Sequence, residues 1–231
     1  MAYVDLNPIR ADMARRLEDC THTSVAVRMA HAGEAPDVVG NRLGPVMGVL
    51  QPPMQITNAD YLQLLDWTGR QLAPGKRGRI IGVPPACLHE IQYTQDTHNS
   101  GNPDSSTTVF PTDFTKRRAH LRCMAQARAQ RVPPGSDGLY HCVQRCVRRA
   151  FLCGLDRYTG RSFEHRKDWI EQRLRVLSEC FAVSIHAYAI MSNHLHLVVQ
   201  LAPGAAACWS DEDVAARWLR LFPRRDDTDE A

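Results

Sequence analysis

The stretch from His186 to Val199 constrains the fold most, because it contains two short apolar runs separated by a Ser-Asn pair. This pattern predicts a β-hairpin. The second run begins with His194, Leu195 and His196. Side chains alternate between the two faces of a strand, so both histidines should project from one face and Leu195 from the other. Two imidazoles placed in this way can share a divalent cation, although strand histidines can also face solvent or bond to neighbouring groups.

The segments around the hairpin predict an α+β fold. Residues 139–146 have the β-branched and aromatic content of a strand, and residues 162–181 carry apolar side chains at helical spacing, with Ser162 as the expected N-cap. A last helix should begin after Ser210. The order strand, helix, strand, strand, helix is most of a split β-α-β-β-α-β fold of the ferredoxin-like type, with its final strand missing.

The first third of the chain is predicted to be mainly helical. Pro8 should open a helix over residues 9–17. A second helix should run from Asn58 to Gly69, capped by Asn58 or Asp60. Between these helices the chain is rich in glycine and proline, and no regular structure is predicted there.

Composition divides the chain into four parts. Residues 92–108 are polar, poor in aliphatic side chains and rich in turn formers, which is typical of a linker. The predicted parts are a helical segment 1–91, a polar and basic linker 92–123, an α+β segment 124–222, and an acidic, disordered tail 223–231. The sequence leaves open whether the first of these parts docks on the third.

Composition also bears on location. The chain contains no apolar run long enough to span a membrane, and its first ten residues do not resemble a signal peptide. We therefore expect a cytoplasmic protein with no membrane partner, in which the eight cysteines are reduced thiols. The spacing of Cys142, Cys146 and Cys153 lacks the two-residue knuckle of a structural zinc site.

Basic residues gather between Lys116 and Arg149, where Asp137 is the only acid. This density is expected of a surface that contacts a nucleic-acid backbone, and a solvated basic surface is an equal alternative when the stretch is taken alone. A second basic group lies in and beside the loop of residues 73–78 and consists of Lys76, Arg77 and Arg79. These side chains could contact phosphates, but a solvated loop is the favoured interpretation. The predicted DNA-binding side chains of the longer stretch are Arg128, Arg131, Arg145, Arg148 and Arg149.

Several blocks of the sequence resemble one known family. Residues 140–145, 160–167 and 187–196 are similar to the amino-terminal half of REP-associated tyrosine transposases, which belong to the single-tyrosine branch of the HUH (histidine–hydrophobic–histidine) nucleases. Residues 1–11 resemble a motif from near the carboxy-terminal end of the same family, and the helix predicted at 58–69 resembles the family's tail. The resemblance implies an HUH domain with an incomplete ferredoxin-like fold.

The blocks occur in the reverse of the family order. The centre of the family protein, which should follow Phe222 and carries the helix with the nucleophilic tyrosine, has no counterpart here. The simplest interpretation is that the tail of one gene copy has been read through into the head of a tandem second copy. The resemblance then implies that the nucleophile is missing.

The resemblance implies a reaction and its cofactor. Family members nick and join single-stranded or hairpin DNA through a tyrosine hydroxyl that becomes a 5′-phosphotyrosine, and Mg²⁺ or Mn²⁺ offsets the charge on the phosphate. His194 and His196 would be two neutral ligands of that cation. The third ligand is not identified from the sequence, and two histidines alone hold such hard cations weakly.

Tyr188 is the nearest tyrosine in sequence and a weak candidate for the nucleophile. With a two-residue turn, Met191 opposes His194, Ala189 opposes His196, and Tyr188 lies on the other face. With a three-residue turn, Tyr188 opposes His196 and lies on the face of the hairpin that carries both histidines. A second route is a tyrosine supplied by an intact sibling transposase or by a second copy of the chain.

Three functional hypotheses follow. The first is a transposase-family DNA-binding protein, related to DNA transposition and recombination enzymes of bacteria, that is catalytically impaired when alone. The second is a nucleic-acid binder without the chemistry. The third is a fused gene remnant that folds poorly because neither half brings a complete core.

Overall fold

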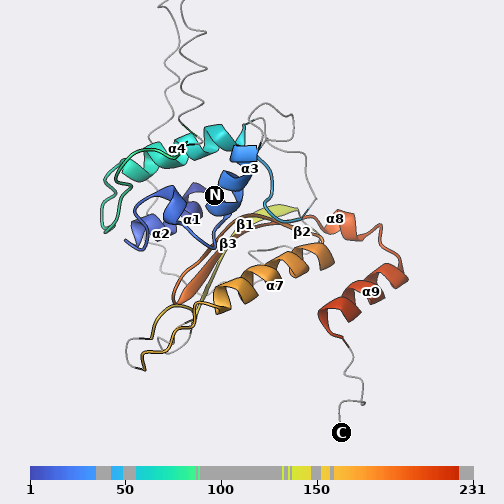
Figure 1. The fold of residues 1–231 in the computed structure, drawn as a ribbon. Coiled ribbons are helices and arrows are strands. Elements are labelled where there is room, and N and C mark those ends of the chain that lie inside the picture. The colour runs from blue at the N-terminus through green and yellow to red at the C-terminus, as the bar shows by residue number, and fades with distance from the viewer. Residues whose placement is uncertain are drawn as a thin grey trace, which may run out of the picture.

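The structure is a computed structural model, and it describes residues 1–34, 43–48, 56–86, 88, 132, 135, 137–146, 152–156 and 159–223. The predicted linker at 92–123 and all but the first residue of the acidic tail lie outside these ranges. The described parts form an α+β fold in which helices cover both faces of one antiparallel sheet (Figure 1). The predicted fold class is therefore confirmed at this level.

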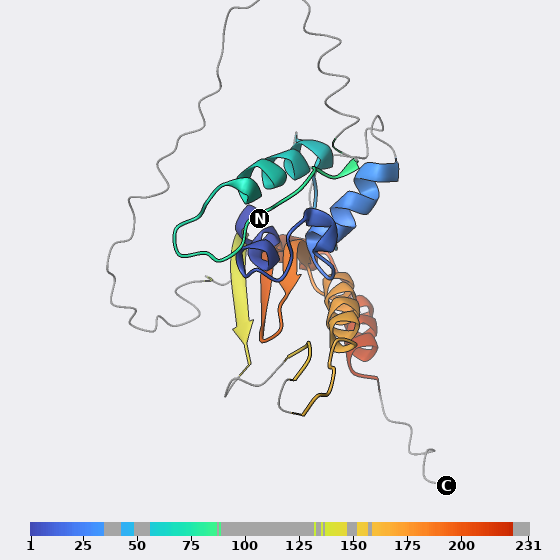
Figure 2. The ribbon, with the colours of Figure 1, turned by 60° about the vertical axis from the view of Figure 1, so that its left-hand side comes forward.

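The sheet contains β1 (Gly138–Arg145), β2 (Val183–Ile190) and β3 (His194–Leu201) in the order β1-β3-β2. Both pairings are antiparallel, so β1 and β2 run in the same direction with β3 between them. The helix α7 (Arg166–Cys180) lies between β1 and β2 in the sequence. β1 lies at one edge of the sheet and is largely exposed (Figure 2).

The hairpin has the two-residue turn. The Met191 amide donates to the His194 carbonyl over 2.9 Å, and Ser192 and Asn193 form the turn between them. In this register Tyr188 pairs with Leu197 rather than with a histidine. The apolar side chains of the two strands are thereby divided between the two faces of the sheet.

One face of the sheet packs against α7. Tyr188, Ile190 and Leu195 are buried there in one cluster with Leu174 of the helix, and Ile170 packs against its edge. The helix begins at Arg166, four residues later than predicted, because Ser162 forms an isolated β-bridge with Leu155 and residues 164 and 165 form a turn. The predicted stripe on α7 is therefore a core stripe.

The opposite face packs against α1 (Ala2–Asp5) and α3 (Ser24–Glu34), which lie above the sheet in Figure 1. Val4 is buried in one cluster with Ala187, Ala189 and Val198. Two isolated β-bridges, Thr23 with Ala189 and Met47 with Ile185, add backbone contacts. Segment 1–91 therefore docks on segment 124–222, and the two share a core.

Among the described residues, the first segment also contains α2 (Asn7–Arg10), the 3₁₀ turn η1 (Leu17–Asp19) and α4 (Asn58–Arg70). The helix predicted over residues 9–17 ends at Arg10, because Asp12 adopts a left-handed conformation with φ of 59° that a helix does not accommodate. The cluster that joins these elements contains Leu6, Ile9, Leu17, Val25, Leu62 and Leu65.

Helix caps follow the chemistry expected from the sequence, with one shift in position. Thr57, not Asn58 or Asp60, is the N-cap of α4, and Asp60 completes its capping box. After the short helix α8 (Pro203–Ala206), the last helix α9 (Asp211–Leu221) begins as predicted behind Ser210, whose hydroxyl accepts from the Asp213 amide over 3.2 Å.

Arg28 ties the two segments together from inside the protein. Only 2% of the residue is exposed. Its guanidinium donates to the Asn58 side chain over 2.9 Å, to the Gly44 carbonyl over 3.1 Å and to the His186 carbonyl of β2 over 2.7 Å. Asp5 lies in the same buried region and accepts from the hydroxyl groups of Ser24 and Tyr61.

Replacing Arg28 with methionine should lower the free energy of unfolding by about 3 kcal/mol, because its buried acceptors lose their donor. Urea unfolding followed by circular dichroism measures this loss. The same replacement at Arg173, which is exposed on α7, is the control and should change stability by less than about 0.5 kcal/mol.

The shared core also predicts a single cooperative unfolding transition for the intact protein. Two separate transitions, or an Arg28 variant as stable as the control, would show that the two segments do not fold as one unit.

Candidate functional site

His194 and His196 project from the same face of β3, as the period of the strand predicts, and their ring centroids are 4.7 Å apart. His196 is 5% exposed, whereas His194 is half-buried at the start of the strand. Leu195 is buried on the opposite face. Below, the sheet face that carries these rings is called the histidine face.

β1 adds a third imidazole to the histidine face. His141 stacks on His196 with ring centroids 5.3 Å apart and an interplanar angle of 16°. The His141 Nε2 and His196 Nδ1 atoms share a hydrogen bond of 3.1 Å. Sequence patterns alone did not identify His141, because only the register of β1 on β3, with Val143 opposite His196, brings the two rings together.

The hydrogen bonds of the two β3 histidines orient them for a cation. The His194 Nδ1 atom donates to the Asn193 side-chain oxygen over 2.6 Å, which leaves the lone pair on Nε2. If His196 donates its Nδ1 proton to His141, its lone pair is also on Nε2. Such outer partners fix the tautomer of metal-binding histidines in many proteins.

The surroundings keep these imidazoles neutral. Burial, followed by the positive charge of His194, His141, Arg145 and Lys76, lowers the pKa of His196 to about 4. Burial and Arg145 also lower the pKa of His194. Neutral imidazoles are good ligands for a cation. A ring with the low pKa of His196 is also a poor base toward a phenol, because the ordinary pKa of a phenol is about 10.

This shift links stability to pH. The folded state lowers the pKa of His196 from 6.5 to about 4, so it favours the neutral ring. That contribution is complete above pH 6.5 and is lost as the pH falls toward 4. Because Arg145 and Lys76 are exposed and solvent screens their charges, we expect a loss of about 1–2 kcal/mol rather than the full value of the shift.

Urea unfolding of the wild type and of His196→Gln at several pH values between about 7.5 and 4.5 measures this effect. Glutamine cannot take up the proton, so the variant should lose less stability over this range, and carboxylates common to both proteins cancel in the comparison. Equal losses in the two proteins would contradict the assignment.

Tyr3 brings a phenol to the histidine face. Its ring centroid lies 5.7 Å from that of His141 and 6.1 Å from that of His196, and both contacts are edge-on. The side chain is 59% exposed, whereas its neighbour Val4 is buried against the sheet. The sequence predicts only that the family's tyrosine helix is missing, and that stays a prediction; docking of α1 on the sheet brings Tyr3 into ring contact with His141 and His196.

Tyr188, the weak candidate from the sequence, does not reach the site. It lies on the α7 face of the sheet, is fully buried and pairs with Leu197. Burial, followed by the negative charge of Glu171, raises its pKa. Tyr188 is therefore a packing residue.

Room for a ligand exists next to Tyr3. A cavity of about 280 Å³ lies between α1 and β1, and its lining includes Tyr3, Tyr140 and His141. A second cavity, of about 290 Å³, lies between α1, α2 and the loop after α4, and Tyr3 and Lys76 belong to its lining. Tyr3 thus forms part of the wall of both cavities, and a chain-like ligand can approach it from either.

Two cations flank the histidine face. Arg145 is exposed at the end of β1, opposite His194 in the register. Lys76 lies with its Nζ atom 5.6 Å from the centroid of the Tyr3 ring. Of the predicted DNA-binding arginines, only Arg145 is described by the structure; the others are Arg128, Arg131, Arg148 and Arg149, which lie outside the described residues.

The donors fit a loosely held cation rather than a closed metal site. Within the described ranges, no three or more His, Cys, Asp or Glu side chains are arranged to hold a metal ion. The Nε2 atoms of His194 and His196 supply two neutral donors, and water and phosphate oxygens would fill the other positions. Imidazole donors suit Mn²⁺ better than Mg²⁺, which prefers oxygen ligands.

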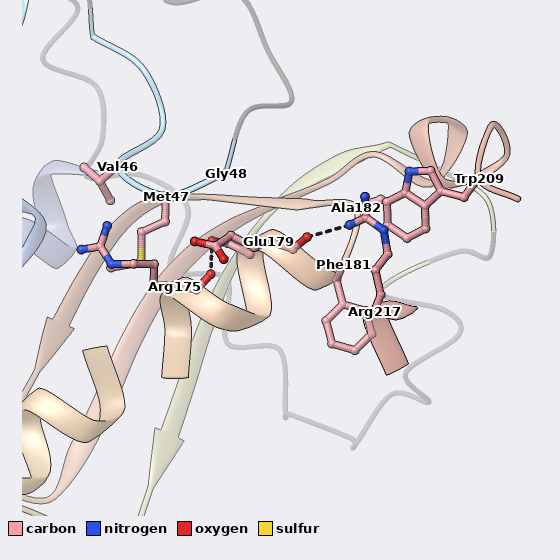
Figure 3. Close-up of a pocket in the computed structure, with 10 residues that line it drawn as sticks. Val46, Met47, Gly48, Arg175, Glu179, Phe181, Ala182, Trp209 and Arg217 are labelled. Carbon is pink, nitrogen blue, oxygen red and sulfur yellow. Dashed lines mark hydrogen bonds between the residues drawn. The ribbon is translucent and has the colours of Figure 1, made fainter. Parts of the chain in front are cut away.

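A further cavity, of about 470 Å³, lies near Val183, at the opposite end of β3 from His194 (Figure 3). Arg217 of α9 crosses it, stacks on Trp209 and donates to the Glu179 carbonyl of α7 over 2.6 Å. These contacts fasten α9 to α7. The cavity therefore belongs to a structural junction and carries none of the histidines.

Comparison with models of protein families, with curated proteins and with solved structures gives no significant match. No helix in the parts of the chain that the structure describes is long and apolar enough to cross a membrane. The six cysteines among those parts are all free thiols. The functional assignment therefore depends on the geometry of the histidine face and on the motifs in the sequence.

Proposed function

We propose that this protein is a metal-dependent enzyme that nicks and joins single-stranded DNA, of the transposase type, with Tyr3 as the nucleophile. His194 and His196 hold Mn²⁺ or Mg²⁺, and Arg145 contacts the DNA backbone. The observation that carries the proposal is the position of the Tyr3 ring, 6.1 Å from that of His196 and open to solvent.

The step is a transesterification. The Tyr3 phenolic oxygen attacks the phosphorus atom, and the bond from phosphorus to the 3′ oxygen breaks. The products are a 5′-phosphotyrosine and a free 3′ hydroxyl, and the phenolic proton is released to solvent while the leaving oxygen takes one up. A bound cation supplies neutralisation of the charge that develops on the phosphate oxygens.

The chain's own groups prepare this step. Tyr3 is exposed at one end of a short helix, so its hydroxyl can meet a phosphate without unfolding of the core. The neutral ring of His194 keeps its Nε2 lone pair for a cation, and His196 does so in the tautomer whose Nδ1 atom donates to His141. Binding of the phosphate between Tyr3 and the two histidines would place the reacting atoms close together and correctly oriented, so that the step no longer depends on a bimolecular encounter.

The topology supports the same proposal. The sheet order β1-β3-β2, with β1 and β2 parallel and α7 between them in the sequence, is the order expected if the fold is an incomplete ferredoxin-like one without its last strand. Although the family-like sequence blocks occur in reversed order, Tyr3 and the histidines lie close together in space. Tyr3 comes from the first segment and the histidines from the second, so one cytoplasmic chain carries the whole set.

A denaturing gel tests the proposal. The purified protein, incubated with Mn²⁺ and a 3′-labelled single-stranded hairpin DNA, should form a labelled covalent adduct that disappears with EDTA. With 5′-labelled DNA the label should leave instead on the released fragment that carries the free 3′ hydroxyl. A nucleic-acid binder without the chemistry would retard the DNA on a native gel and give no adduct. That outcome, with correctly folded protein, would overturn the proposal.

A further inference from the structure

The loop between α4 and Ile80 places a cation over the proposed nucleophile. The Lys76 Nζ atom lies 5.6 Å from the centroid of the Tyr3 ring. Its charge also acts on His196, 120 residues later in the chain, since it is one of the causes that lower the pKa of that ring. The cation therefore lies beside the proposed nucleophile, on the Tyr3 side of the histidine face.

The loop is fixed to α2, so this placement is built into the fold. The Arg10 guanidinium donates to the Gln71 carbonyl over 2.8 Å and to the Thr68 carbonyl over 2.7 Å. Gly78 passes so close to α2 that an added Cβ atom would lie 1.9 Å from the Ile9 carbonyl oxygen. Only glycine fits there, and these contacts hold the loop of residues 71–79 against α2.

Among the described residues, no acidic side chain neutralises the Lys76 ammonium group. No ion pair in the described parts of the chain involves Lys76, which is exposed. The cavity beneath it is lined mainly by apolar groups, with Ala2, Leu6 and Ala73 beside Tyr3. A flexible ammonium group above an apolar wall suits a ligand with an anionic backbone and apolar sugar or base surfaces.

We propose that Lys76 and this cavity form a phosphate-binding subsite, which holds a phosphodiester of single-stranded DNA beside Tyr3. The inference rests on the proposed function and extends it, because it assigns to the first segment a part in substrate binding. The ammonium group binds a non-bridging phosphate oxygen, and the neighbouring sugar or base lies in the cavity between α1 and the loop.

The test measures binding in a background that cannot cleave. In Tyr3→Phe protein, the affinity for a labelled single strand of about 20 nucleotides is measured by fluorescence anisotropy at several salt concentrations. Adding Lys76→Met should weaken binding about three- to tenfold and reduce the slope of log affinity against log salt by about 0.7, the value for one lost phosphate contact on a single strand. Lys76→Arg should retain most of the affinity.

Arg77→Met is the matched control, because Arg77 is the next residue of the same loop and is also exposed. It should leave affinity and salt slope near those of the parent. Equal effects of the Lys76 and Arg77 changes, or no change in slope for Lys76→Met, would overturn the inference. Since the binding assay needs no cleavage, a Lys76 effect on binding together with a wild-type protein that forms no covalent adduct would refute the proposed reaction and leave the subsite in place.

Discussion

Replacing Tyr3 with phenylalanine is expected to abolish the covalent protein–DNA adduct while folding and DNA binding persist. The change removes one oxygen atom from a side chain that is 59% exposed, so the core is not disturbed. Loss of a nucleophile without a substitute lowers rates by more than about 10³-fold. Adduct formation over time on a denaturing gel measures the effect.

Two other tyrosines provide matched controls. Tyr140 lines the cavity next to Tyr3, and Tyr188 is buried on the far face of the sheet. Tyr140→Phe and Tyr188→Phe should each retain the adduct, because neither hydroxyl is assigned to the reaction. An adduct that survives in Tyr3→Phe and is lost in one of the controls would reassign the nucleophile.

Replacing His196 with alanine is expected to lower Mn²⁺-dependent adduct formation by more than about 10²-fold, because one of two imidazole donors is removed. His194→Ala should have an effect of similar size. His141 does not reach the cation in this arrangement but bonds to His196 Nδ1, so His141→Ala should cost about 10- to 100-fold, the range for an outer partner of a metal ligand.

His165 is the control for these replacements, since it lies before α7 and contacts the Trp169 ring edge-on, away from the histidine face. His165→Ala should retain activity. Rates measured over a series of Mn²⁺ concentrations distinguish weakened metal binding from a lost step, because the first is recovered at high metal. Full activity of His196→Ala at all metal concentrations would exclude a role for the pair.

Local patterns in the sequence were enough to predict the hairpin and its two faces. The side chains of a strand alternate with a period of two residues, so His194 and His196 share a face of β3 independently of the rest of the fold. The caps of α4 and α9 are short-range chemistry and were found at or next to their positions. The helix expected to start at Ser162 was less predictable, because a turn in the structure precedes it.

The rest of the site depends on contacts between distant segments. Tyr3, Lys76 and His141 are far apart in the sequence and meet His196 only through the docking of α1 and the register of β1. The hydrophobic periodicity of a sequence does not predict such contacts between distant segments. Residues 1–11, considered without the sheet on which α1 packs, therefore did not suggest that Tyr3 lies near the histidines.

The shared core bears on the hypothesis of a poorly folding remnant. Val4 of the first segment is buried among strand residues of the second, and Arg28 donates to the His186 carbonyl from the other side of the junction. Each segment completes the other, so neither has to bring a whole core. We therefore expect the chain to act as one folded unit, with its active-site groups drawn from both segments.

Peptide mapping of the covalent adduct is the most direct test of this account. After reaction with Mn²⁺ and single-stranded DNA, nuclease trimming and proteolysis, mass spectrometry locates the residue that carries the nucleotide phosphate. The account predicts a phosphotyrosyl bond at Tyr3. A modified peptide that contains another tyrosine, or a folded and DNA-bound protein that yields no modified peptide, would contradict it.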